Sequence, residues 1–177
     1  MIHLRQATSQ DVPILNYWDT LPHVQESDGE DPSWDWENEL GVAYPWREQL
    51  IAEVDGKSIG FIQIIDPKEE ISHYWGEIGP NYRAIDIWIG EVDYLNKGYG
   101  TQMMTKAISI CFEPPEVHTI ILDPLKSNTN AQRFYKRLGF EFVEERQFGY
   151  DECLVFQLTR TNWLENYADR FNNSATS

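Results

Sequence analysis

After residue 80, strand-like and helix-like segments alternate along the chain, and this alternation restricts the fold more than any other feature. Tyr82 to Gly90 alternates isoleucines with other residues, which is the period of a strand. Helical and strand-like segments then follow in turn, at 98–112, 117–122, 129–138, 140–145 and 153–158. The order β-α-β-α-β-β predicts an α/β domain with a mostly covered sheet.

Three further strands and a first helix have clear signals before residue 66. Ile2 to Gln6 is strand-like, and Thr8 to Asp11 resembles a capping box that begins a helix running to about Thr20. The segments 48–54 and 58–65 are rich in strand-forming residues. Asp55-Gly56-Lys57 between them is a hairpin signal, because glycine readily adopts a positive φ.

The remaining segments carry weaker signals. Residues 21–33 are polar and turn-rich, so we expect irregular structure there. Asp31-Pro32 favours the start of a helix that carries Trp34 and Trp36. Asp66 to Tyr82 is predicted to be a long loop, and such loops often border a functional site. Residues 172–177 are expected to be frayed.

Length and charge limit the organisation and the partners. With 177 residues we expect one domain over residues 1–160 and a partly disordered C-terminal extension over 161–177. The formal net charge of -15 would repel a phosphate backbone, so nucleic acid is not an expected partner. Solubility explains most of this surplus, but it also permits a cationic small substrate.

The N-terminal segment, the cysteines and the histidines predict where the protein is located and whether it binds a metal. The segment MIHLRQATSQ has no apolar signal region, and no stretch is long enough to span a bilayer, so we expect a cytoplasmic protein without membrane contact. Cys111 and Cys153 lie in apolar-rich segments and are expected to be buried thiols. The 4 histidines have no ligand spacing, so no metal site is predicted.

A glycine turn joins a loop to a helix at Leu95 to Thr101. Gly98 and Gly100 allow a tight turn that leaves amide N–H groups pointing out of a helix N-terminus, which is typical of a phosphate site. A simple turn at a helix start has the same pattern. The turn lacks both the Lys-Ser/Thr of a P-loop and the third glycine of a dinucleotide fingerprint.

A second pattern runs along one helix and past its end. It reads Asn128-x-x-Ala131-x-x-x-Tyr135-x-x-x-Gly139-Phe140, and the spacings of four place Ala131 and Tyr135 on one helix face. Glycine then ends the helix. This structural interpretation accounts for Gly139 and Phe140 but not for Asn128 or Tyr135.

Together, the two patterns resemble the GNAT superfamily of N-acetyltransferases. Gly98 and Gly100 fit its pyrophosphate motif Q/R-x-x-G-x-G/A, although Leu95 stands where Gln or Arg is usual, and the resemblance covers roughly residues 2 to 158. It implies a mixed sheet of about six to seven strands, flanked by about four helices and splayed between its central strands. It also implies acetyl-CoA as co-substrate.

Within that superfamily, the chain is most similar to the aminoglycoside 6'-N-acetyltransferases, in which leucine also occurs at the place of Leu95. Ala84 to Gly90 resembles their central strand, and the resemblance implies that Asp86 contacts the reactive amine. Ile121 to Asn128 resembles their D-P-x-x-x-N segment, which implies that Asp123 also faces the substrate. Asp151 or Glu152 falls near a third acidic position, in an ambiguous register.

The resemblance also assigns the cofactor contacts. The splayed strand around Trp88, Ile89 and Gly90 would hold the pantetheine and the acetyl carbonyl, and Tyr135 would protonate the departing thiolate. The remaining cofactor residues implied are Lys97, Gly98, Tyr99, Gly100, Thr101 and Asn128. Asp86 would act as base or only orient the amine. Two plainer interpretations stay open, namely a core tyrosine at 135 and an exposed Asp86 paired with Arg83.

The expected activity is therefore acetyl transfer to a primary amine of a cationic small molecule, with the 6'-amine of an aminoglycoside as the leading substrate. Another amine, such as a hydroxylysine-type siderophore, a polyamine or a peptide, stays open. So does a non-catalytic CoA-binding module. The protein is expected to be a monomer or a homodimer.

Overall fold

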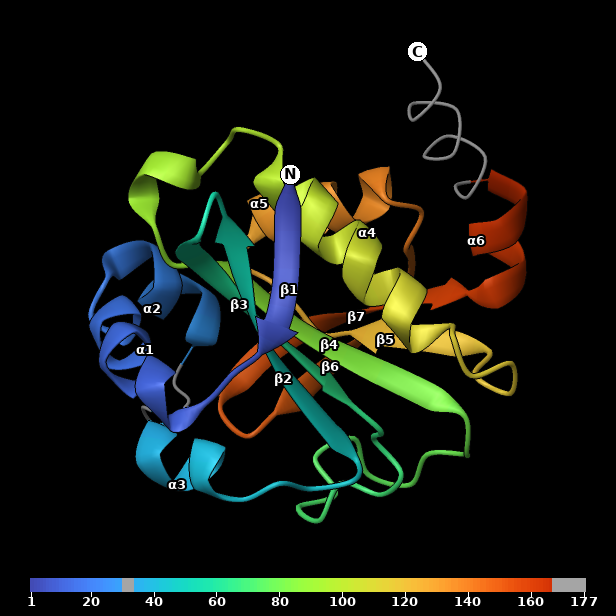
Figure 1. The fold of residues 1–177 in the computed structure, drawn as a ribbon. Coiled ribbons are helices and arrows are strands. Elements are labelled where there is room, and N and C mark those ends of the chain that lie inside the picture. The colour runs from blue at the N-terminus through green and yellow to red at the C-terminus, as the bar shows by residue number, and fades with distance from the viewer. Residues whose placement is uncertain (30–33, 167–177) are drawn as a thin grey trace.

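The computed structural model describes residues 1–29 and 34–166, which contain one open sheet of seven strands with helices on both faces (Figure 1). The strand order across the sheet is β1-β2-β3-β4-β5-β7-β6. The strands are β1 (Ile2–Gln6), β2 (Arg47–Val54), β3 (Lys57–Ile65), β4 (Tyr82–Ile89), β5 (Thr119–Leu122), β6 (Glu141–Phe148) and β7 (Asp151–Thr159). The predicted α/β class and sheet size are confirmed.

The direction of strand pairing changes at the centre of the sheet. All neighbouring strands pair antiparallel except β4 and β5, which are parallel and therefore need a crossover connection. The predicted hairpin joins β2 to β3, with Asp55 and Gly56 at φ values of 52° and 79°. Two positive φ values in a two-residue loop match the twist of the strands they connect.

Six α-helices lie within the described residues. They are α1 (Val12–Asp19), α2 (Pro22–Asp28), α3 (Trp36–Gly41), α4 (Tyr99–Cys111), α5 (Thr129–Arg137) and α6 (Arg160–Asn166), and two 3₁₀ turns span Ser9–Asp11 and Val92–Tyr94. The predicted capping box precedes α1, and the Thr8 amide donates to Asp11 Oδ2 at 2.8 Å. In Figure 1, α4 and α5 lie over one face of the sheet, and α1, α2 and α3 lie on the other side.

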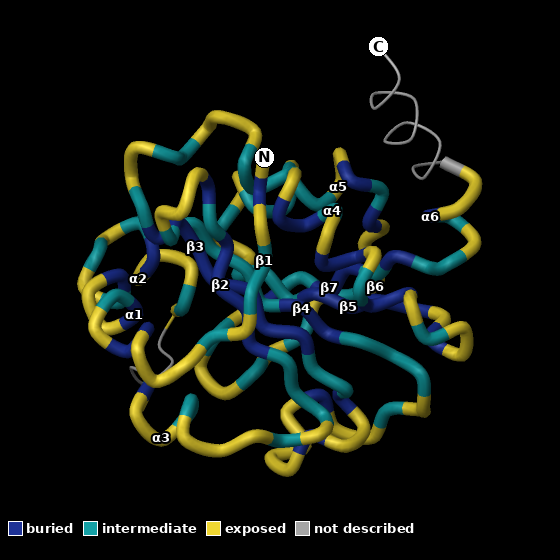
Figure 2. Tube along the Cα trace, in the orientation of Figure 1, coloured by how far each residue is buried: buried dark blue, intermediate teal, exposed yellow. Residues whose placement is uncertain are grey.

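Two apolar cores separate these helices from the sheet. Met103 and Met104 of α4 pack with Ile62 of β3 on one face. Trp18 of α1 packs with Phe61, the residue before Ile62, on the other face. Successive strand residues point to opposite faces, so β3 supplies both cores. Figure 2 shows the buried positions concentrated along the central strands, with the exposed positions in the outer turns and loops.

The segment before residue 42 differs from its prediction. Residues 22–28 form α2 rather than irregular structure, and Pro22 occupies the first turn, where its missing N–H costs nothing. The next helix begins at Trp36, with the Asp35 side chain accepting from the Asn38 amide, so Trp34 precedes the helix instead of lying in it. Asp31 and Pro32 lie outside the described residues.

The end of the described chain is helical. Helix α6 begins at Arg160, at the expected domain boundary, and Trp163 is buried in the core cluster that contains Met103 and Met104. Residues 167–177, including the expected frayed tail, lie outside the described residues.

The remaining observations concern the loop after β3, the two cysteines and the length of the helices. The segment from Asp66 to Asn81 holds no helix or strand, as predicted, and Cys111 and Cys153 are both buried. Within 1–29 and 34–166, no helix has both the length and the apolar character needed to cross a membrane.

Candidate active site

The glycine turn leads directly into the N-terminus of α4. Asn96 and Gly98 have φ values of 58° and 83°, and α4 begins directly after Gly98. The first N–H groups of a helix have no partner inside it, so the amides of Tyr99, Gly100 and Thr101 point out of this end. Backbone amides and the helix dipole together favour a phosphate here, which needs no side chain from Leu95.

Two lysines lie beside this turn. A depression of about 320 Å³ is lined by Lys57, Asp93, Tyr94, Lys97 and Tyr99. Lys97 and Tyr99 were predicted from the sequence, whereas Lys57 comes from the distant start of β3. Its ammonium pairs with Glu91 at 3.0 Å. The depression therefore brings a second cation close to the predicted phosphate site.

The splay between β4 and β5 is confirmed. The two strands pair only from Tyr82 to Ala84, so the rest of β4 has no neighbour on that side. The Gly90 amide donates to Ile59 of the β3 side at 2.9 Å, and backbone groups of an antiparallel strand alternate in direction. The amides of Ile87 and Ile89 therefore face the gap.

This alternation distinguishes the three residues that the resemblance assigns to the pantetheine and acetyl carbonyl. Of Trp88, Ile89 and Gly90, only Ile89 directs its amide into the gap, because the amides of the other two face β3. The carbonyl of Ile89 accepts from His23 Nε2 at 3.0 Å. Gly90 also has a packing role, because a Cβ there would lie 2.1 Å from the Trp18 ring.

Helix α5 accounts for the second pattern. The Asn128 side chain caps the helix by accepting from the Ala131 amide at 3.1 Å, a structural role that the sequence pattern left unexplained. Gly139, at φ 96°, lets the chain turn, and the Phe140 amide donates to the Tyr135 carbonyl at 3.1 Å. Both ends of α5 are thereby fixed, which sets the position of Tyr135.

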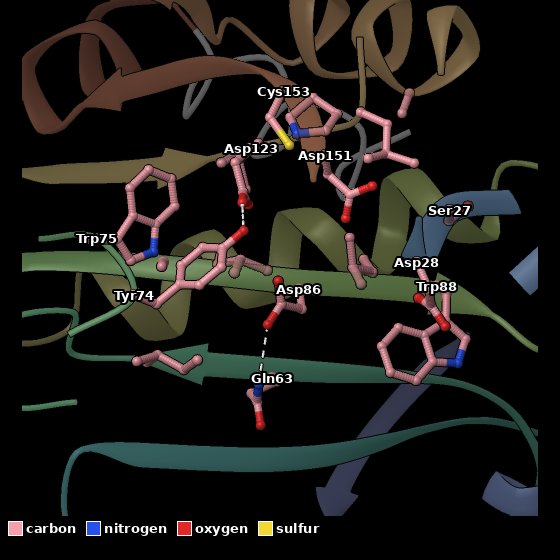
Figure 3. A pocket seen from close by; sticks show the side chains of 18 of the residues that line it. Ser27, Asp28, Gln63, Tyr74, Trp75, Asp86, Trp88, Asp123, Asp151 and Cys153 are labelled. Atoms are coloured by element: carbon pink, nitrogen blue, oxygen red, sulfur yellow. Dashed lines mark hydrogen bonds between the residues drawn. The ribbon is translucent and has the colours of Figure 1, made fainter. Parts of the chain in front are cut away.

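A cavity of about 400 Å³ opens on the splayed part of the sheet (Figure 3). It brings together the predicted residues Asp86, Trp88, Asp123, Asn128, Tyr135 and Asp151. Burial raises the pKa of Tyr135, and the negative charges of Asp86 and Asp123 raise it further. Tyr135 is therefore a neutral phenol in the physiological range, close to two carboxylates.

Asp86 projects from β4 into this cavity. Its Oδ2 accepts a hydrogen bond from Gln63 Nε2 of β3 at 3.0 Å (Figure 3). Arg83 lies three residues away on the same strand and thus on the opposite face. Arg83 pairs with Asp66 at 3.3 Å, which disfavours the plainer interpretation of an Asp86–Arg83 ion pair.

The loop before β4 supplies an aromatic wall next to Asp123. Tyr74 donates from its hydroxyl to Asp123 Oδ2 at 2.5 Å. The Tyr74 ring stacks on Phe148 with centroids 4.5 Å apart, and Trp75 meets Phe148 edge-on at 5.2 Å. Asp123, directly after β5, is therefore held between the loop and the sheet.

The two candidates for the third acidic position differ in their location. Asp151, at the start of β7, lines the cavity, whereas Glu152 is exposed and does not. A Cβ added at Gly29 would lie 2.6 Å from Asp151 Oδ1, so this carboxylate packs closely against the chain after α2. In Figure 3, Asp151 lies in the upper part of the view and Asp28 lies at the right, beside Trp88.

A family model described as an acetyltransferase (GNAT) domain matches residues 7–148, which is most of the chain. The chain belongs to the GNAT acetyltransferase family. This membership, with the splayed sheet and the glycine turn, confirms that the protein is an N-acetyltransferase that uses acetyl-CoA.

Proteins similar to this chain in sequence or in fold include acetyltransferases named for aminoglycosides and for spermidine. Aminoglycoside N(6')-acetyltransferase type 1 of Klebsiella pneumoniae is 29% identical over 154 residues, or 79% of this chain and 74% of the relative. The crystal structure of aminoglycoside acetyltransferase AAC(6')-Ib with coenzyme A and kanamycin has a TM-score of 0.84 at 26% identity, covering 94% of this chain and 99% of that one. Spermidine N-acetyltransferase from Vibrio cholerae, with CoA and spermine, shares the fold at 16% identity and a TM-score of 0.74, covering 92% and 98%.

The acetyltransferase has the features that acetyl-CoA requires. The amides at the start of α4 suit the pyrophosphate, and the gap beside Ile87 and Ile89 leaves backbone donors for an extended chain. Gly100 adds little to packing, because a Cβ there would approach Phe134 only to 3.7 Å. Its small size is thus not demanded by the protein's own core.

Several cavity residues of the acetyltransferase were missed from the sequence. Asp28 ends α2, in a segment predicted to be irregular, so nothing in the local sequence indicated that it lines a cavity. Glu70 also lines the cavity; burial would raise its pKa, but hydrogen bonds from Ser72 and Tyr74 outweigh this and lower it. No sequence pattern marks Tyr74, which reaches Asp123 only through the fold of the loop.

Proposed function

We propose that this acetyltransferase modifies the 6'-amine of an aminoglycoside antibiotic. The observation that carries the proposal is the charge of the cavity. Six carboxylates occur among its described lining residues, namely Asp28, Glu39, Glu70, Asp86, Asp123 and Asp151. Arg47 is the one cation among those same residues, and it pairs with Glu39.

Such a cavity selects a substrate with several positive charges. At an effective dielectric of about 20, one ion pair at about 4 Å is worth on the order of 4 kcal/mol before desolvation. In Figure 3, Asp123 and Asp151 lie in the upper part of the view, and Asp86 lies below them. A molecule with amines on several rings can engage them at once, and the similarity to aminoglycoside N(6')-acetyltransferase type 1 supports this class.

Bound acetyl-CoA supplies the activated acetyl group. Asp86 orients the substrate ammonium and accepts its proton, directly or through water, so that the amine nitrogen can bond to the acetyl carbon as the C–S bond breaks. The Ile87 and Ile89 amides stabilise charge on the acetyl oxygen. Tyr135 gives its proton to the departing sulfur. The balance is one ammonium and one thioester giving one amide, one thiol and one proton.

A thiol-release assay tests the proposal. The purified protein is incubated with acetyl-CoA and, separately, kanamycin, spermidine, a hydroxylysine or a peptide amine. Release with kanamycin, and none with an aminoglycoside that carries a hydroxyl at the 6' position, is the expected result. Release with spermidine but with no aminoglycoside would contradict the proposal and would indicate that the acidic cavity binds a polyamine. No release with any amine would favour a CoA-binding module.

A further inference from the structure

Three polar side chains form a row across three neighbouring strands on the cavity side of the sheet. Gln49 of β2 stands opposite Gln63 of β3, which stands opposite Asp86 of β4. Gln49 Nε2 donates to Gln63 Oε1 at 3.0 Å, and Gln63 Nε2 donates to Asp86 Oδ2 at 3.0 Å. Both hydrogen bonds therefore point the same way and end on the carboxylate.

This row lies where apolar side chains would be expected. Gln63 is 3% exposed and Gln49 is 9% exposed, although glutamine is usually found on the surface. Their neighbours on the same face include the buried Ile51 and Phe61. A buried amide costs free energy unless it is hydrogen-bonded, so two apolar residues would suit the fold at least as well. The row needs a reason other than stability.

We propose that Gln63 is a positioning residue for Asp86, and that Gln49 fixes the orientation of the Gln63 amide. The inference rests on the role proposed for Asp86 at the amine. An ionised carboxylate only accepts hydrogen bonds, so Gln63 must present its Nε2 to Asp86 and its Oε1 to Gln49. Gln49 must then donate. The orientation of both amides follows from the charge on Asp86.

The hydrogen bond has two consequences for Asp86. It holds Oδ2 on the β3 side, while the second oxygen is directed away from Gln63 in Figure 3. It also stabilises the charged form of the carboxylate, because Gln63 donates to it. The substrate ammonium therefore meets a carboxylate that is already ionised and fixed in direction.

A direct titration tests this role in the free enzyme. The carboxyl carbon of Asp86 is followed by ¹³C NMR against pH in wild type and in Gln63→Met, with Asp86→Asn to assign the signal. The expected result is an apparent pKa about one unit higher in Gln63→Met, because one donor to the ionised form is lost. Gln49→Met should give a smaller rise, and Gln157→Met on β7, outside the cavity lining, none.

The comparison isolates Gln63 from the other groups around Asp86. The other titratable groups among the described lining residues of the same cavity are Asp28, Glu39, Arg47, Glu70, Tyr74, Asp123, Tyr135, Asp151 and Cys153. All of them stay in place in the three glutamine variants. A change confined to Gln63→Met and Gln49→Met therefore reports the row itself.

Kinetics provide the second readout. The acid limb of kcat/KM for the amine should move up by the same one unit or so in Gln63→Met, while the dissociation constant for acetyl-CoA changes by less than about twofold. An unchanged Asp86 titration in a folded Gln63→Met protein would overturn the proposal. If Gln63→Met does not fold, an unchanged titration in Gln49→Met would overturn it equally. The titration needs no substrate, so its result is independent of which amine is acetylated.

Discussion

The hydroxyl of Tyr74 donates a 2.5 Å hydrogen bond to Oδ2 of Asp123 and so ties the loop before β4 to the carboxyl end of β5. The Tyr74 ring stacks on Phe148, and the aromatic side chains of Tyr74 and Trp75 line the cavity. The cavity thus combines an aromatic surface with carboxylates around it. Sugar rings that carry ammonium groups match both features, since their apolar faces can lie on aromatic rings.

Replacing Asp86 separates the amine side from the cofactor side. Asp86→Asn keeps the shape of the side chain but removes its charge and its ability to take a proton. We expect kcat/KM for the amine to fall about 100-fold or more, because general acid–base groups contribute at this level. Calorimetric titration should show an acetyl-CoA affinity within about twofold of wild type. An equal loss of acetyl-CoA binding would contradict the assignment.

Asp151 and Glu152 form a matched pair of adjacent acids. Asp151 lines the cavity and Glu152 is exposed outside it. Asp151→Asn should raise the KM for a polycationic amine by about tenfold, since a partly screened ion pair is lost. Glu152→Gln removes the same charge a residue away and should change KM by less than about twofold. Equal effects would mean that overall charge, rather than contact, attracts the substrate.

Two glycines should differ sharply in their tolerance of alanine. A Cβ at Gly90 would lie 2.1 Å from the Trp18 ring, whereas one at Gly100 meets Phe134 at 3.7 Å. Gly90→Ala should therefore lower the free energy of unfolding by about 2 kcal/mol or more, and Gly100→Ala by less than about 0.5 kcal/mol. Urea denaturation measures both. A stable Gly90→Ala protein would show that α1 is not packed on β4 as described.

Tyr135 should supply a proton over an unusually wide pH range. Burial and the charges of Asp86 and Asp123 raise its pKa above the usual value of about 10. The phenol is protonated below its pKa, so raising the pKa extends the acid form upward in pH. We therefore expect no fall in wild-type kcat from ionisation of Tyr135 below about pH 10. Tyr135→Phe should lower kcat about tenfold or more and leave the alkaline limb of its pH profile unshifted in that range. Stopped-flow thiol release across that pH range measures both effects. If wild type lost activity with rising pH below about pH 10 and Tyr135→Phe did not, the loss would belong to Tyr135 and would contradict its raised pKa.

Periodicity and motif spacing predicted most of what positions the site. The isoleucine alternation placed Asp86 on the face opposite Ile85, and the pattern from Asn128 to Phe140 located α5 and Tyr135. Which backbone amides face the gap depends on the pairing of β4 with β3, which no sequence period reveals. The packing of Gly90 against Trp18 is equally invisible in the sequence, because the two residues are far apart along the chain.

The acidic lining was only partly predictable for a related reason. Asp123 and Asp151 stand at strand ends within recognisable patterns, but Asp28 lies on α2, a short helix whose polar sequence hid its buried Val24. Gln63 and Tyr74 join the site through cross-strand register and loop geometry. Contacts between residues that are far apart in sequence, such as Tyr74 with Asp123, become visible only in the folded chain.

The position of the acetyl group on the product tests the central claim most directly. Kanamycin is incubated with the protein and acetyl-CoA, and the product is examined by two-dimensional ¹H–¹³C NMR. The account predicts one acetyl group, on the 6' nitrogen. An acetyl group on any other nitrogen, or unmodified kanamycin in a reaction that acetylates spermidine, would contradict it.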